Sequence, residues 1–219
     1  MRVLVFDTET TGLPPHKSRE VSVMDHVEWP HIVQFSYIIY NSSEENIDLI
    51  IDRVICIPDC VEITTENCAI HGITKEMTKK GCPIYPVLLE FMRYMSECDI
   101  VVAHNIEFDL NMVVVELVRL GLLQEIEYIH GAGKYYCTMQ QSIDLCNIRV
   151  VSKYGNKEYV KFPSLSNLHE HFFGVVPLHL HNSVNDVLIC LRCFYKMKFK
   201  NDICEKNAEI ENLMKKLIP

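Results

Sequence analysis

The chain has 219 residues, enough to bury a sizeable core in one large domain, with or without a small appendage. Its formal net charge of −8 argues against a protein that coats nucleic acid or an anionic membrane nonspecifically, because every phosphate contact needs a positive partner. No apolar run approaches the ~18 residues that span a bilayer, and the N-terminus has the pattern of a strand rather than a signal peptide, so we expect a soluble intracellular protein of the cytoplasm or nucleus, without a membrane partner.

Three β-rich segments lie near the start of the chain. Residues 2–9 and 31–40 are rich in apolar strand formers, and a third such run covers 47–57. The turn signal Asn-Ser-Ser at 41–43 separates the second run from the third. We therefore expect an antiparallel meander of these strands, with residues 14–30 as a surface excursion.

Helical and strand patterns alternate over the rest of the chain. Apolar residues at helical spacing predict helices over 83–97, 107–120, 139–147, 164–173 and 182–198. Short strands are expected at 99–105 and around 136–138, and the polar stretch 152–161 is predicted to be a hairpin or loop. The pattern indicates an α/β protein with a mixed sheet. We expect a main domain over 1–200 and a C-terminal amphipathic helix or tail over 201–219.

Two carboxylates follow the apolar run of the first strand. Asp7 and Glu9 are two positions apart, so on a strand they share one face and converge. Adjacent carboxylates repel each other, and both ionise readily only if a cation lies between them. Oxygen ligands alone favour hard ions such as Mg²⁺ or Mn²⁺. Taken without the rest of the chain, the pair is equally consistent with a solvated strand end.

Two further acids lie near predicted helix starts. Asp109 follows a buried strand where a helix begins, a position at which the helix dipole also favours negative charge. Asp186 lies near the start of another helix, and His181 precedes it by five positions. At that spacing the two side chains would not share a helical face. We therefore place His181 in the loop before the helix, with Asn182 or Ser183 as the helix cap.

Three motifs, in this order, resemble a known family. Residues 7–12 read Asp-Thr-Glu-Thr-Thr-Gly, residues 104–109 read His-Asn-Ile-Glu-Phe-Asp, and a histidine at 181 precedes the aspartate at 186. Together they resemble the DEDDh branch of the DnaQ-like 3′–5′ exonucleases, over about residues 2–195. The resemblance implies a ribonuclease H-like fold, with a mixed five-stranded sheet flanked by helices. Smaller matches agree, namely Ala-Ile-His-Gly-Ile at 69–73, Cys-Thr-Met at 137–139 and Leu-Ser-Asn-Leu at 165–168.

The resemblance also implies a role for each matching position. Asp7, Glu9 and Asp186 match the residues that hold the metal at which the nucleophilic water is generated. Asp7 would also touch a second ion, supported by Asp109, and His181 matches the general base. The other matching positions grip the terminal nucleotide or line its pocket: Thr10, Thr11, Leu13, His71, His104 and Asn105. Where the family usually has Arg or a small residue and then Ala after the histidine, this chain has Asn-Ser.

The chemistry of phosphodiester hydrolysis fits these residue types. The reaction needs a nucleophile at neutral pH and stabilisation of charge on the phosphate, which two Mg²⁺ or Mn²⁺ ions roughly 4 Å apart supply. Four carboxylates suit two dications, and a histidine with an ordinary pKa near 6.5 can take a proton from water. We expect a 3′–5′ exonuclease that releases nucleoside 5′-monophosphates from single-stranded or frayed DNA. Processivity should be low unless a partner, such as a DNA polymerase or clamp, tethers the enzyme.

Two alternative functions stay open. The same fold can act chiefly on RNA, as a 3′-end trimming enzyme, because no motif in the chain fixes how the pocket treats the 2′-OH. A degenerate domain could instead bind nucleic-acid ends or a polymerase without cutting. The complete set of four acids and a histidine argues against that last alternative, since a binding module need not retain them.

Other conspicuous patterns have plain structural interpretations. Arg192, Lys196 and Lys200 form a basic helix stripe, for which a solvated face is favoured over a phosphate track. His169 and His171 lack the spacing of a helical metal motif, so a structural role is favoured. The ten cysteines, without a secretion signal, indicate reduced thiols rather than disulfides or a zinc site.

Overall fold

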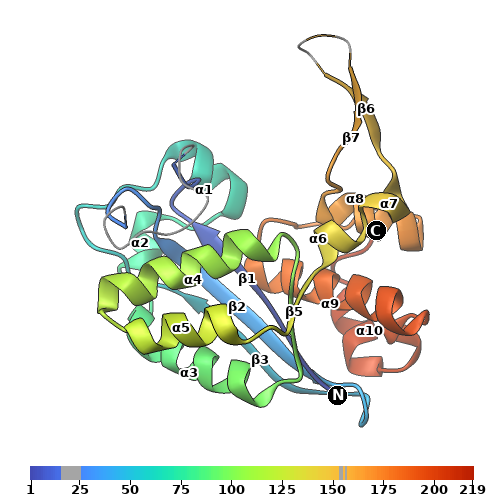
Figure 1. Cartoon of the computed structure of the whole chain (residues 1–219), viewed down its shortest axis with the longest axis horizontal. Helices are drawn as coiled ribbons and strands as arrows, with labels where there is room; N and C mark the ends of the chain where they lie inside the picture. The colour runs from blue at the N-terminus through green and yellow to red at the C-terminus, as the bar shows by residue number, and fades with distance from the viewer. Residues whose placement is uncertain (16–25, 153–154, 156) are drawn as a thin grey trace.

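A computed structural model describes the chain except for residues 16–25, 153–154 and 156, and its centre is a mixed five-stranded sheet (Figure 1). The strands are β1 (Arg2–Thr10), β2 (Ile32–Asn41), β3 (Asn46–Val54), β4 (Ile100–Ala103) and β5 (Tyr135–Cys137). Their order is β3-β2-β1-β4-β5, with antiparallel pairs on the β3 side and parallel pairs on the β5 side. The predicted mixed sheet and its antiparallel meander are confirmed. Most of the predicted surface excursion lies outside the described residues.

Helices cover both faces of the sheet (Figure 1). They are α1 (Thr65–His71), α2 (Lys75–Thr78), α3 (Ile84–Glu97), α4 (Ile106–Leu120), α5 (Leu123–Gly131), α6 (Thr138–Gln141), α7 (Ile143–Cys146), α8 (Leu165–Phe173), α9 (Ser183–Phe199) and α10 (Ala208–Met214), with a 3₁₀ turn η1 (Ile203–Glu205). None of the described helices combines the length and the apolar character that crossing a membrane requires.

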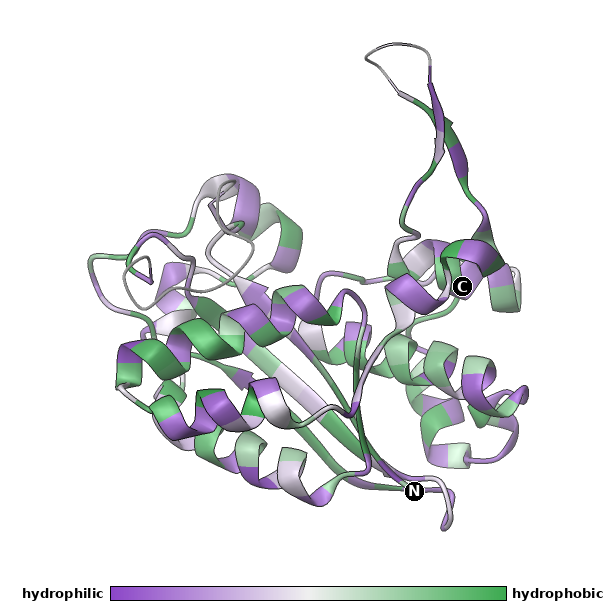
Figure 2. Ribbon diagram, viewed as in Figure 1, coloured by the Kyte–Doolittle hydropathy of each residue, from purple (hydrophilic) through white to green (hydrophobic). Residues whose placement is uncertain are grey.

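The central strand β1 explains why the sheet is buried on both faces. Leu4 and Phe6 belong to the core beneath α3 and α4, whereas Val3 and Val5 belong to the core beneath α9 and α10. Because successive side chains of a strand point to opposite faces, a strand covered on both sides needs a continuous apolar run. Figure 2 shows the sheet interior as mostly hydrophobic. The apolar run ends where Asp7 begins, at the carboxyl end of the strand.

One predicted helix is divided, and three helices lacked a sequence prediction. The helix expected over 139–147 is instead α6 and α7, because at Ser142 the chain leaves helical geometry (φ −108°, ψ 3°). The buried Ser142 hydroxyl donates a hydrogen bond to the Met139 carbonyl (3.1 Å), which competes with the helical pattern. Helices α1, α2 and α5 are short, and short helices carry too few turns for a clear apolar period.

The stretch predicted as a hairpin or loop forms a hairpin that extends away from the body of the protein (Figure 1). Strands β6 (Arg149–Val151) and β7 (Glu158–Val160) pair only with each other among the described strands.

In the C-terminal region, Ile210 and Met214 of α10 are buried in the same core as Val3 of β1.

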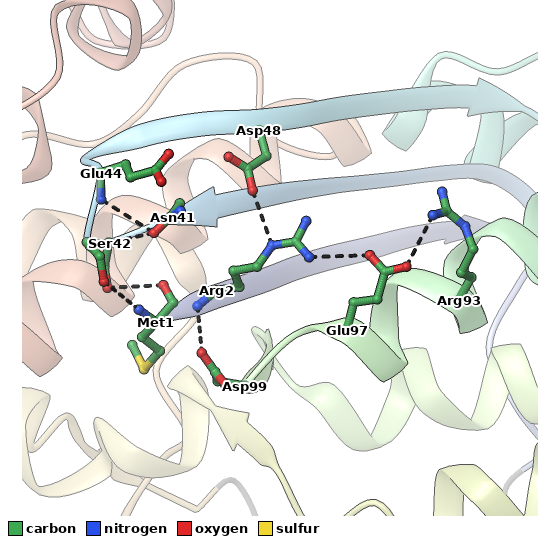
Figure 3. Close-up of polar contacts among 10 residues, drawn as sticks. Met1, Arg2, Asn41, Ser42, Glu44, Asp48, Arg93, Glu97 and Asp99 are labelled. Atoms are coloured by element: carbon green, nitrogen blue, oxygen red, sulfur yellow. Dashed lines mark hydrogen bonds and ion pairs between the residues drawn. The ribbon is translucent and has the colours of Figure 1, made fainter.

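Exposed polar contacts stabilise the end of the sheet at which the N-terminus lies (Figure 3). The Arg2 guanidinium contacts the carboxylates of Asp48 (3.2 Å) and Glu97 (3.3 Å), and its backbone N–H donates to Asp99 (2.8 Å). The Met1 carbonyl accepts from the Ser42 N–H (2.9 Å). These contacts join β1 to β3 and to the end of α3, at the opposite end of β1 from Asp7 and Glu9.

The three residues of the basic stripe on α9 differ in burial: Arg192 is buried, Lys196 is partly buried and Lys200 is exposed. Arg192 therefore belongs neither to a phosphate track nor to a solvated face. Its Nε donates to Asp202 (3.0 Å), its Nη1 lies 3.1 Å from His169 Nε2, and its guanidinium stacks 3.8 Å from the centre of the Phe173 ring. The Arg192 side chain is buried, and it ties α9 to α8 and to the residues before η1. The predicted structural role of His169 fits this packing, since its Nδ1 lies 2.8 Å from the Val175 carbonyl.

Replacing Arg192 with alanine should lower the free energy of unfolding by about 3 kcal/mol, because the partly buried Asp202 carboxylate loses the buried guanidinium that pairs with it. Lys198 on the same helix is exposed, so Lys198→Ala should change stability by less than about 0.5 kcal/mol. Urea denaturation of both variants measures the difference. Equal effects of the two substitutions would contradict the buried ion pair.

Candidate active site

Three carboxylates from two elements meet at the carboxyl end of β1. Asp7 and Glu9 share a face of β1, and Asp186 lies in the first turn of α9. Each offers one oxygen atom, and these atoms all lie within 4.8 Å of one another. All three side chains are partly buried. The structure therefore brings together the acids that the sequence separates by more than 170 positions.

The start of α9 is anchored to the sheet, which fixes the position of Asp186. The Ser183 hydroxyl donates to the backbone carbonyl of Asp7 (2.7 Å), and the Ser183 N–H donates to Gln34 Oε1 on β2 (3.3 Å). Asn182 occupies the cap position predicted for Asn182 or Ser183, although its side chain makes no capping hydrogen bond. Three residues after Ser183, the helix geometry carries Asp186 over Asp7.

Asp109 approaches the same place from α4. Its Oδ1 accepts two hydrogen bonds from Thr8, from the backbone N–H (3.0 Å) and from the hydroxyl (2.8 Å). The side chain is almost completely buried, with 2% of its surface exposed. Among the described residues, the group whose oxygens converge within 4.8 Å contains Asp7, Glu9 and Asp186 but not Asp109. Asp109 is therefore held beside β1, next to the group rather than within it.

Burial raises the pKa of all four carboxyl groups, and the charge of Asp7 raises it further for the other three. Burial and then the charge of Asp7 raise the pKa of Glu9 to about 8. Burial raises the pKa of Asp7, and burial followed by the charge of Asp7 raises the pKa of both Asp109 and Asp186. Ionising these buried acids without a cation therefore lowers the free energy of unfolding of the metal-free protein.

A divalent cation fits this cluster. Asp186 Oδ1 is buried and has no hydrogen-bond partner among the residues that the structure describes, whereas Oδ2 accepts from the backbone N–H of His181 (3.1 Å). An unpaired buried carboxylate oxygen is costly, and a cation would satisfy it while removing the repulsion between the acids. The converging ligands are all oxygens, which Mg²⁺ and Mn²⁺ prefer.

Without divalent ions, these acids should make the fold less stable as the pH rises from about 4 to about 8. Below pH about 4 they are protonated in both states. Above it the unfolded chain loses these protons first, while the folded protein retains them until the raised pKa values are passed, near 8 for Glu9. Melting temperatures in EDTA measure this slope, and added Mg²⁺ should stabilise more at high pH than at low pH.

The variant Glu9→Gln separates this effect from the titration of the rest of the chain. It removes one of the repelling groups, so its melting temperature in EDTA should fall less between pH 6 and pH 8 than that of the wild type. Parallel pH profiles for the two proteins would contradict the assignment of the slope to this cluster.

A cavity of about 500 Å³ opens next to the acids. It is lined by the four carboxylates and by four other residues that the sequence predicts for the site: Leu13, His104, Asn105 and His181. Leu13 is 81% exposed, so its apolar side chain is accessible at the cavity that it lines. Asn105 adopts a left-handed conformation (φ 70°) at the start of α4, which asparagine tolerates better than most residues.

His181 lies in the loop before α9, as predicted, and is exposed to solvent at the cavity. Its backbone is left-handed (φ 64°), and its N–H is held by Asp186. The position of the imidazole is therefore coupled to a carboxylate of the cluster through the main chain. Its ring forms no hydrogen bond with the described residues that would prevent it from accepting a proton.

His104 is held differently from His181. Its Nε2 lies 3.1 Å from the Pro163 carbonyl, which can only accept, so Nε2 carries the proton and Nδ1 accepts from the Thr138 hydroxyl (2.9 Å). Burial lowers the pKa of His104 to about 4, so the ring is neutral at physiological pH. It joins β4, α6 and the segment before α8 and forms a rigid wall of the cavity.

Three residues predicted for the nucleotide pocket do not line this cavity. The Thr10 hydroxyl donates to the Gly12 carbonyl (2.6 Å), and the Thr11 hydroxyl accepts from the His31 N–H (2.9 Å). His71 is buried, and its Nδ1 accepts from the Ile73 N–H (3.0 Å). The contacts of Thr10 and Thr11 shape the turn that follows β1, and the contact of His71 shapes the end of α1. None of the three residues belongs to the cavity wall.

Sequence reasoning missed several lining residues that follow the hairpin. Lys161, Phe162 and Pro163 line the cavity, and Phe162 is 58% exposed. The available signal was an aromatic residue between Lys and Pro in an otherwise polar stretch, which is weak without knowledge of where the hairpin lies.

Solved structures with the same fold include several nucleases. The chain is 18% identical to Exonuclease X in complex with 5′-overhanging duplex DNA (TM-score 0.53), covering 95% of this chain and 98% of that one. It is 14% identical to the nuclease domain of 3′hExo, a DEDDh family member bound to rAMP (TM-score 0.60, 92% and 94% covered). It is 13% identical to E. coli Exonuclease I in complex with a dT13 oligonucleotide (TM-score 0.59), covering 91% of this chain and 42% of that chain.

At these identities the likeness to solved structures shows the fold alone. No curated protein matches the chain. The exonuclease family model of the RNase T type matches residues 4–194, which includes the carboxylates, the histidine loop and most of the cavity wall. The chain therefore belongs to the exonuclease family and is a DnaQ-like 3′–5′ exonuclease.

Proposed function

We propose that this protein removes nucleoside 5′-monophosphates from the 3′ ends of single-stranded or frayed DNA. The observation that carries the proposal is the convergence of oxygen atoms of Asp7, Glu9 and Asp186 within 4.8 Å, where one buried oxygen of Asp186 has no partner in the described part of the chain. A cavity large enough for a nucleotide lies next to them. Two of the similar structures hold DNA, which favours DNA as substrate, while the third holds rAMP.

Each acid has a proposed role in holding divalent ions. Asp7, Glu9 and Asp186 would hold one Mg²⁺ or Mn²⁺, and Asp7 with Asp109 would hold a second. When bound, two such ions lower the pKa of water and stabilise negative charge on the phosphate. The hydrogen bonds from Thr8 orient Asp109 before any ion arrives, so less reorganisation is needed on binding.

The remaining residues of the cavity act on the proton and on the nucleotide. His181 accepts a proton from the attacking water, and its exposure lets that proton pass to solvent. Leu13 packs against the terminal sugar or base, and the turn shaped by Thr10 and Thr11 presents it. His104 and Asn105, which follow β4, form another part of the cavity wall.

Cleavage of end-labelled oligonucleotides tests this function. The protein is incubated with Mg²⁺ or Mn²⁺ and with single-stranded DNA labelled at its 5′ end, which should yield a ladder shortened one nucleotide at a time. The same DNA labelled at its 3′ end should release a labelled mononucleotide first. An RNA of equal sequence tests the alternative substrate, and faster cleavage of RNA would overturn the preference for DNA. Binding without any cleavage would identify a silent end-binding module.

A further inference from the structure

The β6–β7 hairpin has two chemically different faces. In its antiparallel register Val150 lies opposite Tyr159, and the backbone bond from Lys161 N–H to the Ile148 carbonyl (2.9 Å) extends the ladder by one pair. Because side chains alternate, Lys157, Tyr159 and Lys161 share one face. The residues opposite them on β6 carry no charge, so this face has two lysines and no acid among its described residues. We call it the Lys-Tyr-Lys face.

The other face of the hairpin is balanced. It carries Arg149, Val151, Glu158 and Val160, so one positive charge lies beside one negative charge. Among the described residues, no ion pair involves Lys157 or Lys161. On a chain with a net charge of −8, two lysines on one hairpin face that have no ion-pair partner among the described residues form a local exception.

The Lys-Tyr-Lys face is continuous with the active-site cavity. Lys161 lines that cavity. The hairpin that precedes Lys161 extends away from the body of the protein (Figure 1). Tyr159 is 54% exposed, so its ring is available to stack. A two-stranded hairpin with both faces in solvent is only marginally stable by itself, and the described residues leave about half of the Tyr159 surface exposed.

We propose that the Lys-Tyr-Lys face binds the DNA strand whose 3′ end occupies the active site, at nucleotides on the 5′ side of that end. Lysine contacts phosphates, and base stacking on an aromatic ring tolerates any sequence. From Lys157 to Lys161 the face spans about 13 Å, the length of about four nucleotides of a duplex strand. The inference rests on the proposed function, since it places the 3′ end in the cavity.

Lysines on a hairpin can also serve only to prevent its strands from pairing with those of another molecule. Matched substitutions on the two faces of the hairpin distinguish that explanation from DNA binding. The test variant is Lys157→Gln with Tyr159→Ala. The matched control is Arg149→Gln with Val151→Ala, which removes one positive charge and one apolar side chain from the opposite face. Both pairs of positions are exposed, so the fold of the body should be retained, as checked by circular dichroism.

The measurement is the ratio of kcat/KM for an oligonucleotide of about 20 nucleotides to kcat/KM for a dinucleotide. The test variant should lower this ratio about tenfold, and the dependence of KM on salt should weaken by about 0.7 in slope. The control should keep the wild-type ratio. An unchanged ratio in the test variant, or an equal fall in both variants, would overturn the proposal.

Binding without cleavage distinguishes this inference from the proposed function. Fluorescence anisotropy with the same labelled DNA, in Ca²⁺, should show about tenfold weaker affinity for the test variant and none of this loss for the control. If the wild type cuts neither substrate but this difference in affinity persists, the Lys-Tyr-Lys face stands and the catalytic proposal fails. If the dinucleotide is cut and the affinities are equal, the face fails and the catalytic proposal stands.

Discussion

Replacing Asp7 with asparagine should abolish exonuclease activity and at the same time stabilise the metal-free protein. Asp7 interacts with each of the other three acids, because its charge adds to the effect of burial in raising the pKa of Glu9, Asp109 and Asp186. Asparagine keeps the shape of the side chain and removes the charge. Losing an ion that contributes several kcal/mol to the transition state should lower kcat by a factor of about 1,000 or more.

The stability change has the opposite sign because the repulsion between acids disappears. The gain in free energy of unfolding should be about 1–3 kcal/mol in EDTA at pH 8, which for a chain of this size is a rise of about 2–10 °C in melting temperature. Added Mg²⁺ should raise the melting temperature of the wild type more than that of the variant.

Asp48→Asn is the matched control for this substitution. Asp48 is an aspartate that pairs with Arg2 at the opposite end of β1 from the site (Figure 3). Its replacement should leave activity unchanged and cost less than about 1 kcal/mol, since exposed ion pairs contribute little. Retained activity in Asp7→Asn would remove Asp7 from the catalytic site, and a loss of stability in EDTA would contradict the repulsion between the acids.

Replacing His181 with asparagine should lower kcat by a factor of about 100 to 10,000, the usual contribution of a positioned general base. Asparagine suits the left-handed backbone of this position (φ 64°) and retains the N–H that donates to Asp186. It cannot accept the proton. The Mg²⁺-induced rise in melting temperature should therefore persist while turnover falls.

His179 offers a control in the same loop. It too has a left-handed backbone (φ 56°) and an exposed side chain, but it does not line the cavity. The substitution His179→Asn should leave kcat within about a factor of two, measured at saturating Mg²⁺ on the same oligonucleotide. If His181→Asn retains wild-type turnover, another group takes the proton.

The amino-acid sequence was sufficient for much of the fold and for the composition of the site. The apolar run of β1 that ends at Asp7 predicts a strand with carboxylates at its end, because hydrophobic patterning is a local property of the sequence. The long helices α3, α4 and α9 are also predictable, since each has several turns of apolar spacing. The shorter α8 is predictable from its Ser164 cap and from Gly174 at its end.

Tertiary contacts determine which residues are buried and which residues meet at the site, and local sequence patterns do not determine either. Arg192 belongs to a basic stripe in the sequence, yet Asp202 and His169 reach it from other elements and bury it. Asp186 becomes a neighbour of Asp7 only because Ser183 anchors α9 to β1. Lys161 and Phe162, which follow the hairpin, line the cavity, although their local sequence indicates this only weakly. Such contacts join residues far apart in the chain, so their free energies depend on the assembled fold and not on any single segment.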